Sequence, residues 1–323
     1  MKKSFYFDSF GEPKKKIKHA LFVVEALDED EVLVEMRMFP VNPSDLVPIT
    51  GAYAARIKLP KFIGYEGVGI VTAVGAKVPQ KYLGKRVLPL RGEGTWQTLV
   101  KTKLEYIVEV PTKISDVDAA RLYINPLTAT LIVNRVLRIK SGTKILLDGG
   151  FSNLNFLFLQ MLTKIGCQVD AIARSIESKV NLQTYGCQNV FSLNEFKANR
   201  SDKTYDYVID SVGGKTGQAA FNATRKEGTF LSVGLLSGEQ IDSKVFSQAN
   251  KPKIELFYLR HWNAKLSNQA WHFMLQEIMT AVLQKKLLLS PNYAVHSIEK
   301  LENNLELLQL HIKVLIRCHP NNS

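Results

Sequence analysis

The chain has 323 residues, of which 46% are hydrophobic and 22% are charged, and its formal net charge is +12. This length allows two domains with buried cores, and the composition is that of an ordinary soluble globular protein. No apolar run approaches the roughly 18 residues that a membrane span needs, so no membrane role is expected. The charge would suit polyanionic partners, but only Lys14–Lys16 form a dense basic run, and nucleic-acid binding is not expected.

The cysteines and the N-terminus favour a cytoplasmic protein. The first 13 residues enter a short alternating segment rather than a cleavable apolar core, so no targeting peptide is predicted. Cys167, Cys187 and Cys318 are an odd number, lie far apart and have no CxxC spacing. A reduced compartment suits such thiols. The six histidines form no pair at metal-ligand spacing, and none is assigned a catalytic role.

The N-terminal third is β-like. Val32, Val34, Met36 and Met38 alternate with other residues, and 67–75 and 85–90 are further short strands bounded by Gly or Pro. Closely spaced short strands predict a compact barrel.

Near residue 114 the pattern changes to helix. A first helix would begin after the cap Ser115, and a second would follow Asn125 as cap, with Pro126 at its first position. In the tail, Trp271, Met274, Leu275 and Ile278 have helical spacing. A second helix is predicted over 298–310 and a final strand over 312–318, which we expect to return to the first domain because one short strand cannot form a sheet alone.

Strand and helix patterns alternate between these parts. The predicted strands are 144–148, 168–174, 189–193, 205–211, 228–234 and 253–259, with helices between most of them. Such alternation predicts a parallel sheet with helices on both faces. We therefore predict an α/β protein, with domain one formed by 1–122 and 266–323 and domain two by 123–265.

The turn after the first of these strands has the position of a dinucleotide phosphate turn. Gly149 and Gly150 follow the strand and Ser152 precedes the helix, but Asn153 and Asn155 stand where glycines would be expected. Asparagine tolerates positive φ, so the turn can survive. Two outcomes remain open: the asparagine amides bind phosphate, or they fill its space.

Taken together, several motifs resemble the medium-chain dehydrogenase/reductases, in particular their zinc-free quinone reductase and mitochondrial-type 2-enoyl-thioester reductase branch. The resemblance covers nearly the whole chain and rests on the following segments: VNPSD (41–45), GAY (51–53), GYEGVGIVTAVG (64–75), GTWQT (94–98) and INPLTA (124–129). It implies a GroES-like β-barrel catalytic domain and a Rossmann doubly wound cofactor domain, and also a homodimer.

The resemblance also implies that zinc is absent. At the family's zinc-ligand positions the chain has Asn42, Tyr65 and the neighbourhood of Asn125, which offer neither thiolate nor imidazole. Without a Lewis acid, hydrogen-bond donors must polarise the substrate and a proton must reach the enolate. By resemblance Tyr53 serves near that step, and Asn42 would orient substrate or nicotinamide. A rim tyrosine and an Asx turn before Pro43 are the respective structural alternatives.

Other residues are assigned to the substrate pocket or the cofactor. Trp96, Tyr258 and Trp262 would border the pocket, with core or interdomain packing as the alternative. Arg174 and Lys179 follow the second strand of the parallel sheet, where cations favour the 2′-phosphate of NADP(H). Further cofactor contacts are expected from the following residues: Asn125, Thr128, Gly149, Ser152, Asn153, Gly213 and Gly234.

The leading hypothesis is therefore an NADPH-dependent, zinc-independent reductase of activated double bonds. Its substrates would be enones, quinones or 2-enoyl thioesters, free or on an acyl carrier. The alternative is a cofactor-free, non-catalytic family member that acts as a binding protein, which the two asparagines of the phosphate turn suggest.

Overall fold

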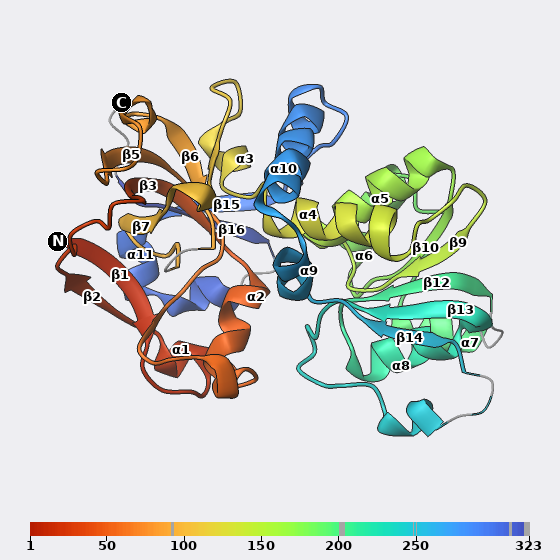
Figure 1. Cartoon of the computed structure of the whole chain (residues 1–323). Helices are drawn as coiled ribbons and strands as arrows, with labels where there is room; N and C mark the ends of the chain where they lie inside the picture. The colour runs from red at the N-terminus through yellow and green to blue at the C-terminus, as the bar shows by residue number, and fades with distance from the viewer. Residues whose placement is uncertain (92–93, 200–203, 248, 250, 310–311, 320–323) are drawn as a thin grey trace. The chain divides into compact units, whose positions relative to one another are not determined.

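The computed structural model divides the chain into two compact units (Figure 1). The structure describes residues 1–91, 94–199, 204–247, 249, 251–309 and 312–319. The first unit comprises 1–124, 267–286 and 291–323, and the second comprises 125–266 and 287–290. These boundaries lie within two residues of those expected at 122/123 and 265/266, except that 287–290 join the second unit.

The first unit contains two sheets. A seven-stranded sheet has the order β15-β16-β3-β5-β6-β8, with β7 also paired to β3, and a three-stranded sheet has the order β2-β1-β4. Their strands have the following bounds: β1 Lys2–Phe7, β2 Lys18–Phe22, β3 Glu31–Val41, β4 Lys61–Phe62, β5 Val68–Val74, β6 Arg86–Pro89, β7 Leu99–Lys103, β8 Ile107–Glu109, β15 Tyr293–Ser297 and β16 Lys313–Arg317.

The predicted alternation in β3 is confirmed, because Val32, Val34 and Met36 are each fully buried. The C-terminal strand also returns to this unit as expected: β16 pairs antiparallel with β3, with Leu315 opposite Pro40. Residues more than 270 positions apart in the chain thus lie side by side, a contact that buries the apolar faces of both strands.

Short helices surround these sheets. Their bounds are α1 Pro13–Lys16, α2 Pro43–Leu46, α3 Asp116–Ala119, α10 Asn268–Leu283 and α11 Ile298–Asn303. Ser115 caps α3 as predicted, and its side chain accepts a hydrogen bond from the Asp118 amide. All four apolar positions predicted for the tail helix are buried in α10. The predicted helix over 298–310 is wrong in extent: α11 ends before Asn304, which is extended, and 305–309 form a 3₁₀ turn.

The second unit is built on a six-stranded parallel sheet of order β11-β10-β9-β12-β13-β14. The parallel sheet predicted from the alternating pattern is confirmed, and its strand order is the doubly wound order that the family resemblance implied. The elements run as follows: α4 Ile124–Leu131, β9 Lys144–Leu147, α5 Asn153–Ile165, β10 Gln168–Ile172, α6 Ile176–Thr184, β11 Asn189–Phe191, α7 Leu193–Asn199, β12 Tyr205–Asp210, α8 Gly214–Asn222, β13 Thr224–Ser232, β14 Lys253–Leu256 and α9 Leu259–Lys265.

Helices cover both faces of this sheet: α5 lies on one face, and α7 and α8 lie on the other (Figure 1). Phe196, Phe221 and Phe230 belong to the apolar core on the α7 and α8 side. One prediction about the entry helix is wrong. Asn125 does not cap it, because α4 already includes Ile124, and a π-helical turn over Ile132–Val136 follows it.

Candidate functional site

The turn between β9 and α5 has the geometry of an anion-binding turn. Gly149 and Gly150 have φ values of 87° and 60°, in the left-handed region that glycine adopts most readily. Ser152 caps α5, with its Oγ accepting a hydrogen bond from the Asn155 amide at 3.1 Å. The backbone N–H groups of the first helical turn make the N-terminus of a helix of this length attractive to phosphate.

Asn155 fits this turn by pointing beneath it. The side chain is fully buried, and its Nδ2 donates to the carbonyls of Asp148 and Gly150, the latter at 2.9 Å. The Nδ2 group thus bonds the turn's own carbonyls, and the buried side chain does not project from the turn. Of the two outcomes left open by the sequence, Asn155 follows neither: it holds the turn together from inside. Asn153, the first residue of α5, is half-buried.

Two other glycines at the carboxyl edge of the sheet are required by close backbone packing. A Cβ on Gly213, whose φ is 70°, would lie 2.4 Å from the Glu239 carbonyl oxygen. A Cβ on Gly234 would lie 2.9 Å from the Ser211 carbonyl oxygen. The structure therefore brings Gly213 and Gly234 to the edge that carries the phosphate turn, because β9, β12 and β13 are parallel neighbours.

The remaining residues predicted to contact a cofactor are placed as follows. Arg174 is exposed two residues after the end of β10, and the side chain of Lys179 lies outside the described residues. On α4, Asn125 is half-buried and Thr128 is 5% exposed. Their cofactor roles stay predictions.

In the first unit, Asn42 is the centre of a buried polar cluster. Its Nδ2 donates to Glu66 Oε1 at 2.9 Å, and its Oδ1 accepts from Lys313 Nζ. Its backbone N–H donates to Asp45 Oδ2 at 2.8 Å, closing the capping box of α2. Asn42, Asp45 and Glu66 are each 2% exposed, and Lys313 is 5% exposed. The charges on either side orient the Asn42 amide, with its NH₂ toward the carboxylate and its oxygen toward the ammonium.

Glu66 links this cluster to the last residues of the segment 1–124. Its Oε2 accepts from the backbone N–H groups of Tyr123 and Ile124, at 3.1 and 2.8 Å, and its Oε1 lies 4.0 Å from Lys313 Nζ. Burial is the main cause that lowers the pKa of Lys313. Burial, followed by the nearby Glu66 charge, raises the pKa of Asp45 to about 7. The cluster is therefore held by hydrogen bonds and by one buried lysine.

Tyr53, the predicted proton donor, is half-buried at the start of a 3₁₀ turn over Ala54–Arg56. The exposed Arg56 guanidinium lies 3.8 Å from the centre of the Tyr53 ring. A cation over the ring is attracted to its π face and leaves the hydroxyl at the edge available. The catalytic assignments of Tyr53 and Asn42 stay predictions.

The structure corrects the assignment of Trp96 to a pocket wall. Its side chain is fully buried, stacks on Phe39 with ring centres 5.7 Å apart, and donates its indole N–H to the Pro40 carbonyl at 3.1 Å. Trp96 therefore belongs to the core of the first unit. Tyr258 is 43% exposed before α9, and Trp262 is half-buried on that helix. Both stay predictions as pocket residues.

The residues at the family's zinc positions are placed as follows. Asn42 is engaged as described above, and Tyr65 is 43% exposed. Within the described ranges, no group of three His, Cys, Asp or Glu side chains could hold a metal ion. Over the same ranges, no helix combines the length and apolarity needed to cross a membrane.

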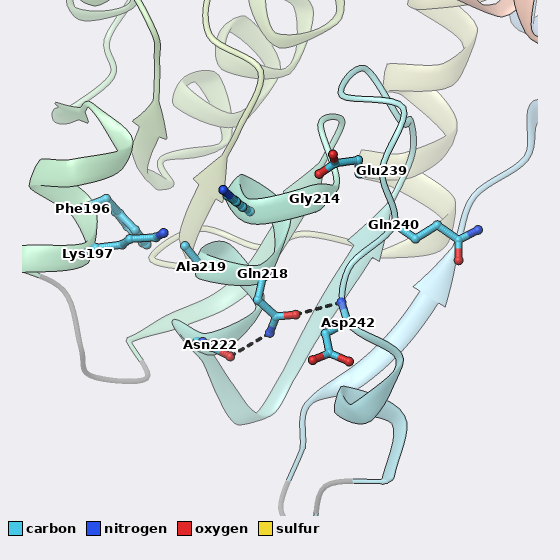
Figure 2. Close-up of a pocket in the computed structure, with 10 residues that line it drawn as sticks. Phe196, Lys197, Gly214, Gln218, Ala219, Asn222, Glu239, Gln240 and Asp242 are labelled. Atoms are coloured by element: carbon cyan, nitrogen blue, oxygen red, sulfur yellow. Dashed lines mark hydrogen bonds between the residues drawn. The ribbon is translucent and has the colours of Figure 1, made fainter.

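A polar groove of about 680 Å³ lies on the α7 and α8 side of the second unit (Figure 2). Gln218 at its centre accepts a hydrogen bond from the Asp242 amide and donates to Asn222 Oδ1. Lys197, Lys215, Glu239 and Asp242 give it mixed charge. Among the residues that the structure describes, none of those predicted for the site lines this groove.

The buried charged residues that sequence reasoning missed include Glu66 and Lys313 in the first unit and Asp148 and Asp210 in the second. The aspartates had a detectable signal, because each directly follows or ends an apolar strand of the parallel sheet. Lys313 had none, since a lysine at the start of a terminal strand is normally exposed.

Comparison with known proteins agrees with this architecture. Residues 28–112 match the alcohol dehydrogenase GroES-like domain family, and residues 156–274 match the zinc-binding dehydrogenase family. The chain is 26% identical to the mitochondrial enoyl-acyl-carrier-protein reductase of Arabidopsis thaliana, over 80% of this chain and 72% of the relative. It is 25% identical to the rat enzyme of the same name, over 88% and 80%.

Among solved structures, a Bacillus thuringiensis protein assigned as an NADPH:quinone reductase superposes with a TM-score of 0.89 at 34% identity, covering 98% of this chain and 99% of the other. Escherichia coli quinone oxidoreductase, complexed with NADPH, superposes with a TM-score of 0.84 at 18% identity, covering 98% and 100%. The second likeness is one of fold.

Proposed function

Since this chain belongs to the medium-chain dehydrogenase/reductase superfamily, we propose that it is an NADPH-dependent reductase of activated carbon–carbon double bonds that works without zinc. The substrates would be 2-enoyl thioesters, quinones or other enones. The observation that carries the proposal is the phosphate turn: Asn155 points inward, so the N-terminus of α5 keeps its anion-binding geometry. The relatives support both substrate classes, since they are enoyl reductases and a quinone reductase by name.

The residues of the second unit fit a bound dinucleotide. Gly149, Gly150 and the capped start of α5 would hold the pyrophosphate. Arg174, exposed just after β10, would hold the 2′-phosphate with its guanidinium. When bound, NADPH supplies a hydride to the β-carbon of the substrate.

The residues of the first unit would supply and position the proton that completes the reduction. The Tyr53 hydroxyl would donate its proton to the α-carbon of the enolate that hydride addition creates, and the phenol would regain a proton from solvent. Asn42 would keep the α2 turn in place, because its amide is fixed between Glu66 and Lys313. In this scheme Asn42 is a positioning residue.

The first experiment follows NADPH oxidation with crotonyl-type thioesters and with quinones. Turnover of either class supports the proposal and identifies the class; bound NADPH with no turnover of either would sink it. Tyr53→Phe should lower kcat by about 10²–10⁴-fold with NADPH binding unchanged, as expected for loss of a general acid. Arg56→Gln, which keeps the phenol, is the matched control, and an unchanged kcat in Tyr53→Phe would remove Tyr53 from the reaction.

Arg174→Ala tests the choice of dinucleotide. Loss of a charge-assisted contact to the 2′-phosphate should reduce kcat/KM for NADPH by about 10–100-fold and leave the value for NADH nearly unchanged. The ratio of the two values is the readout. Equal losses with both dinucleotides would show that Arg174 does not read the phosphate.

The alternative, a cofactor-free binding protein, predicts no NADPH binding in a fluorescence titration. The inward orientation of the Asn155 side-chain amide does not favour this alternative.

Zinc independence predicts full activity after dialysis against a chelator. We also propose that the protein is a cytoplasmic homodimer. β14 lies at the edge of the parallel sheet, where a second copy could add its own edge strand. Light scattering would give the mass of the particle in solution.

A further inference from the structure

Two aspartates lie side by side at the carboxyl edge of the parallel sheet. Leu147 of β9 and Ile209 of β12 are paired in register, so Asp148 and Asp210, which follow them, are neighbours on the same face of the sheet. Asp148 is fully buried and Asp210 is 1% exposed. A buried pair of carboxyls at this edge is unusual, because each ionised carboxylate loses its hydration.

The two carboxyls accept three hydrogen bonds, all from backbone amides. Asp148 Oδ1 accepts from the Ser211 N–H at 2.6 Å. Asp210 Oδ1 accepts from the N–H groups of Gly213 and Val212, at 2.8 and 3.2 Å. In contrast, Asp148 Oδ2 is buried and receives no hydrogen bond from any residue that the structure describes. An unpartnered buried oxygen of this kind is costly as part of a carboxylate but not as a hydroxyl donor.

The surrounding elements offer little countercharge. From α5 the uncharged Asn155 faces the turn, and on α8 Lys215 is exposed. On β10, the neighbour on the other side, Asp170 is in register with Leu146 and bonds to Asn189 and Tyr205. Burial, followed by the charge and hydrogen bond of Asp210, raises the pKa of Asp148 well above its ordinary value.

We propose that Asp148 and Asp210 share one proton, carried on Asp148 Oδ2 and donated to the Asp210 carboxylate, and that this acid pair is a positioning device for the loops at the carboxyl edge. Asp148 bonds to both loops. Its Oδ1 accepts from Ser211 at the start of the β12–α8 loop, and its carbonyl accepts from the Asn155 side chain under the phosphate turn. Asp210 orders Val212 and Gly213 in the same loop. The shared proton keeps these two loops in one arrangement.

The pair has a consequence for coenzyme binding, and this step rests on the proposed function. A second ionised carboxylate beneath the turn would repel a pyrophosphate bound at the start of α5. With the proton in place the pair carries one negative charge instead of two. NADPH affinity should therefore fall as pH rises through the value at which the proton is lost.

Infrared spectroscopy of the full chain tests the acid pair directly. Wild-type protein at neutral pH should show a carboxylic-acid C=O component that is lost in Asp148→Asn and retained in Asp45→Asn, which removes the contribution of the other perturbed carboxyl. No such difference between wild type and Asp148→Asn overturns the proposal, as would be expected if a cation or water occupied the site instead. The band should also fade when the wild-type protein itself is titrated to alkaline pH, a measurement that needs no variant.

Stability and binding give independent readouts. Asp148→Asn keeps both hydrogen bonds, because its amide can donate to Asp210 and accept from Ser211, so its melting temperature should change less with pH than that of the wild type. Asp148→Ala should melt earlier at every pH and exchange the amides of 211–213 faster. Equal losses in Asp148→Asn and Asp148→Ala would contradict a shared proton.

NADPH titrations complete the test. The wild-type dissociation constant should rise on the order of tenfold across the pH range in which the infrared band fades, which corresponds to one pKa unit of linkage, and that of Asp148→Asn should stay nearly constant. Equal pH profiles would overturn the coenzyme step. If NADPH does not bind at all, the proposed function fails, while the acid pair is still decided by its infrared band.

Discussion

In the first unit the buried Glu66 carboxylate lies 4.0 Å from the ammonium of Lys313, whereas in the second unit the buried carboxyls of Asp148 and Asp210 have each other and backbone amides as partners. Both clusters are organised by an asparagine, Asn42 in one and Asn155 in the other. The difference lies in how charge is compensated: by a lysine in the first unit and, as we propose, by a proton in the second. Both forms of compensation depend on pH, because burial lowers the pKa of the Lys313 ammonium and raises the pKa of the Asp148 carboxyl.

Lys313→Met should cause the largest loss of stability. It leaves Glu66 as a buried carboxylate without its cation, and removing one partner of a buried ion pair costs about 3–5 kcal/mol of the free energy of unfolding. Urea unfolding followed by tryptophan fluorescence would report it, since Trp96 and Trp271 are both buried in this unit. Lys313→Met combined with Glu66→Gln should recover part of the loss. If the single variant is as stable as the wild type, the lysine does not compensate Glu66.

Asp45→Asn tests the pH dependence of stability, because Asp45 is the pH-sensitive carboxyl of the first unit. Its pKa is raised from the ordinary 3.8 to about 7, so the folded protein binds more protons than the unfolded chain between these values. Stability should therefore fall as pH rises from about 4 to about 7, by about 1.4 kcal/mol per pH unit and about 4 kcal/mol in total.

Asp45→Asn should remove that slope and still accept the Asn42 N–H through its side-chain oxygen. Urea unfolding at a series of pH values measures it, with the Trp signal of the first unit as probe. Parallel profiles for wild type and variant would mean that Asp45 is ionised in the folded protein throughout this range.

Asn155→Gly introduces the glycine that the sequence pattern led us to expect at this position, and its effect should be smaller than those of the two changes above. It removes two hydrogen bonds to the carbonyls of Asp148 and Gly150 and adds a glycine to the first turn of α5. A loss of about 2–3 kcal/mol is expected, from about 1 kcal/mol per bond and about 1 kcal/mol for the glycine. Thermal unfolding of the second unit would measure it.

Asn153→Gly is the matched control for this change. Asn153 is half-buried at the first position of α5, and no hydrogen bond from its side chain is needed to close the turn. The control should lose about 1 kcal/mol or less. Equal losses in the two variants would show that the inward Asn155 bonds do not stabilise the turn.

Local patterns predicted the elements well where the chain itself provides the signal. The alternation in β3, the Ser115 cap, the start of a helix after Ser152 and the apolar positions of α10 depend on spacing within a short segment, and the structure confirms them. The break at Asn304 was missed, because a helical apolar pattern continues across it.

The two-part architecture, the parallel sheet and the resemblance to the medium-chain dehydrogenase/reductases could be predicted from the sequence, because hydrophobic periodicity and short motifs are local properties. The contacts of the polar residues became visible only in the folded protein. Asn42 accepts a hydrogen bond from Lys313, which is 271 positions away in the chain. Asp148 and Asp210 are neighbours because the two parallel strands that lead to them are paired. Whether a polar side chain is exposed, paired or orphaned depends on which distant segment packs on it, and residue spacing does not encode that.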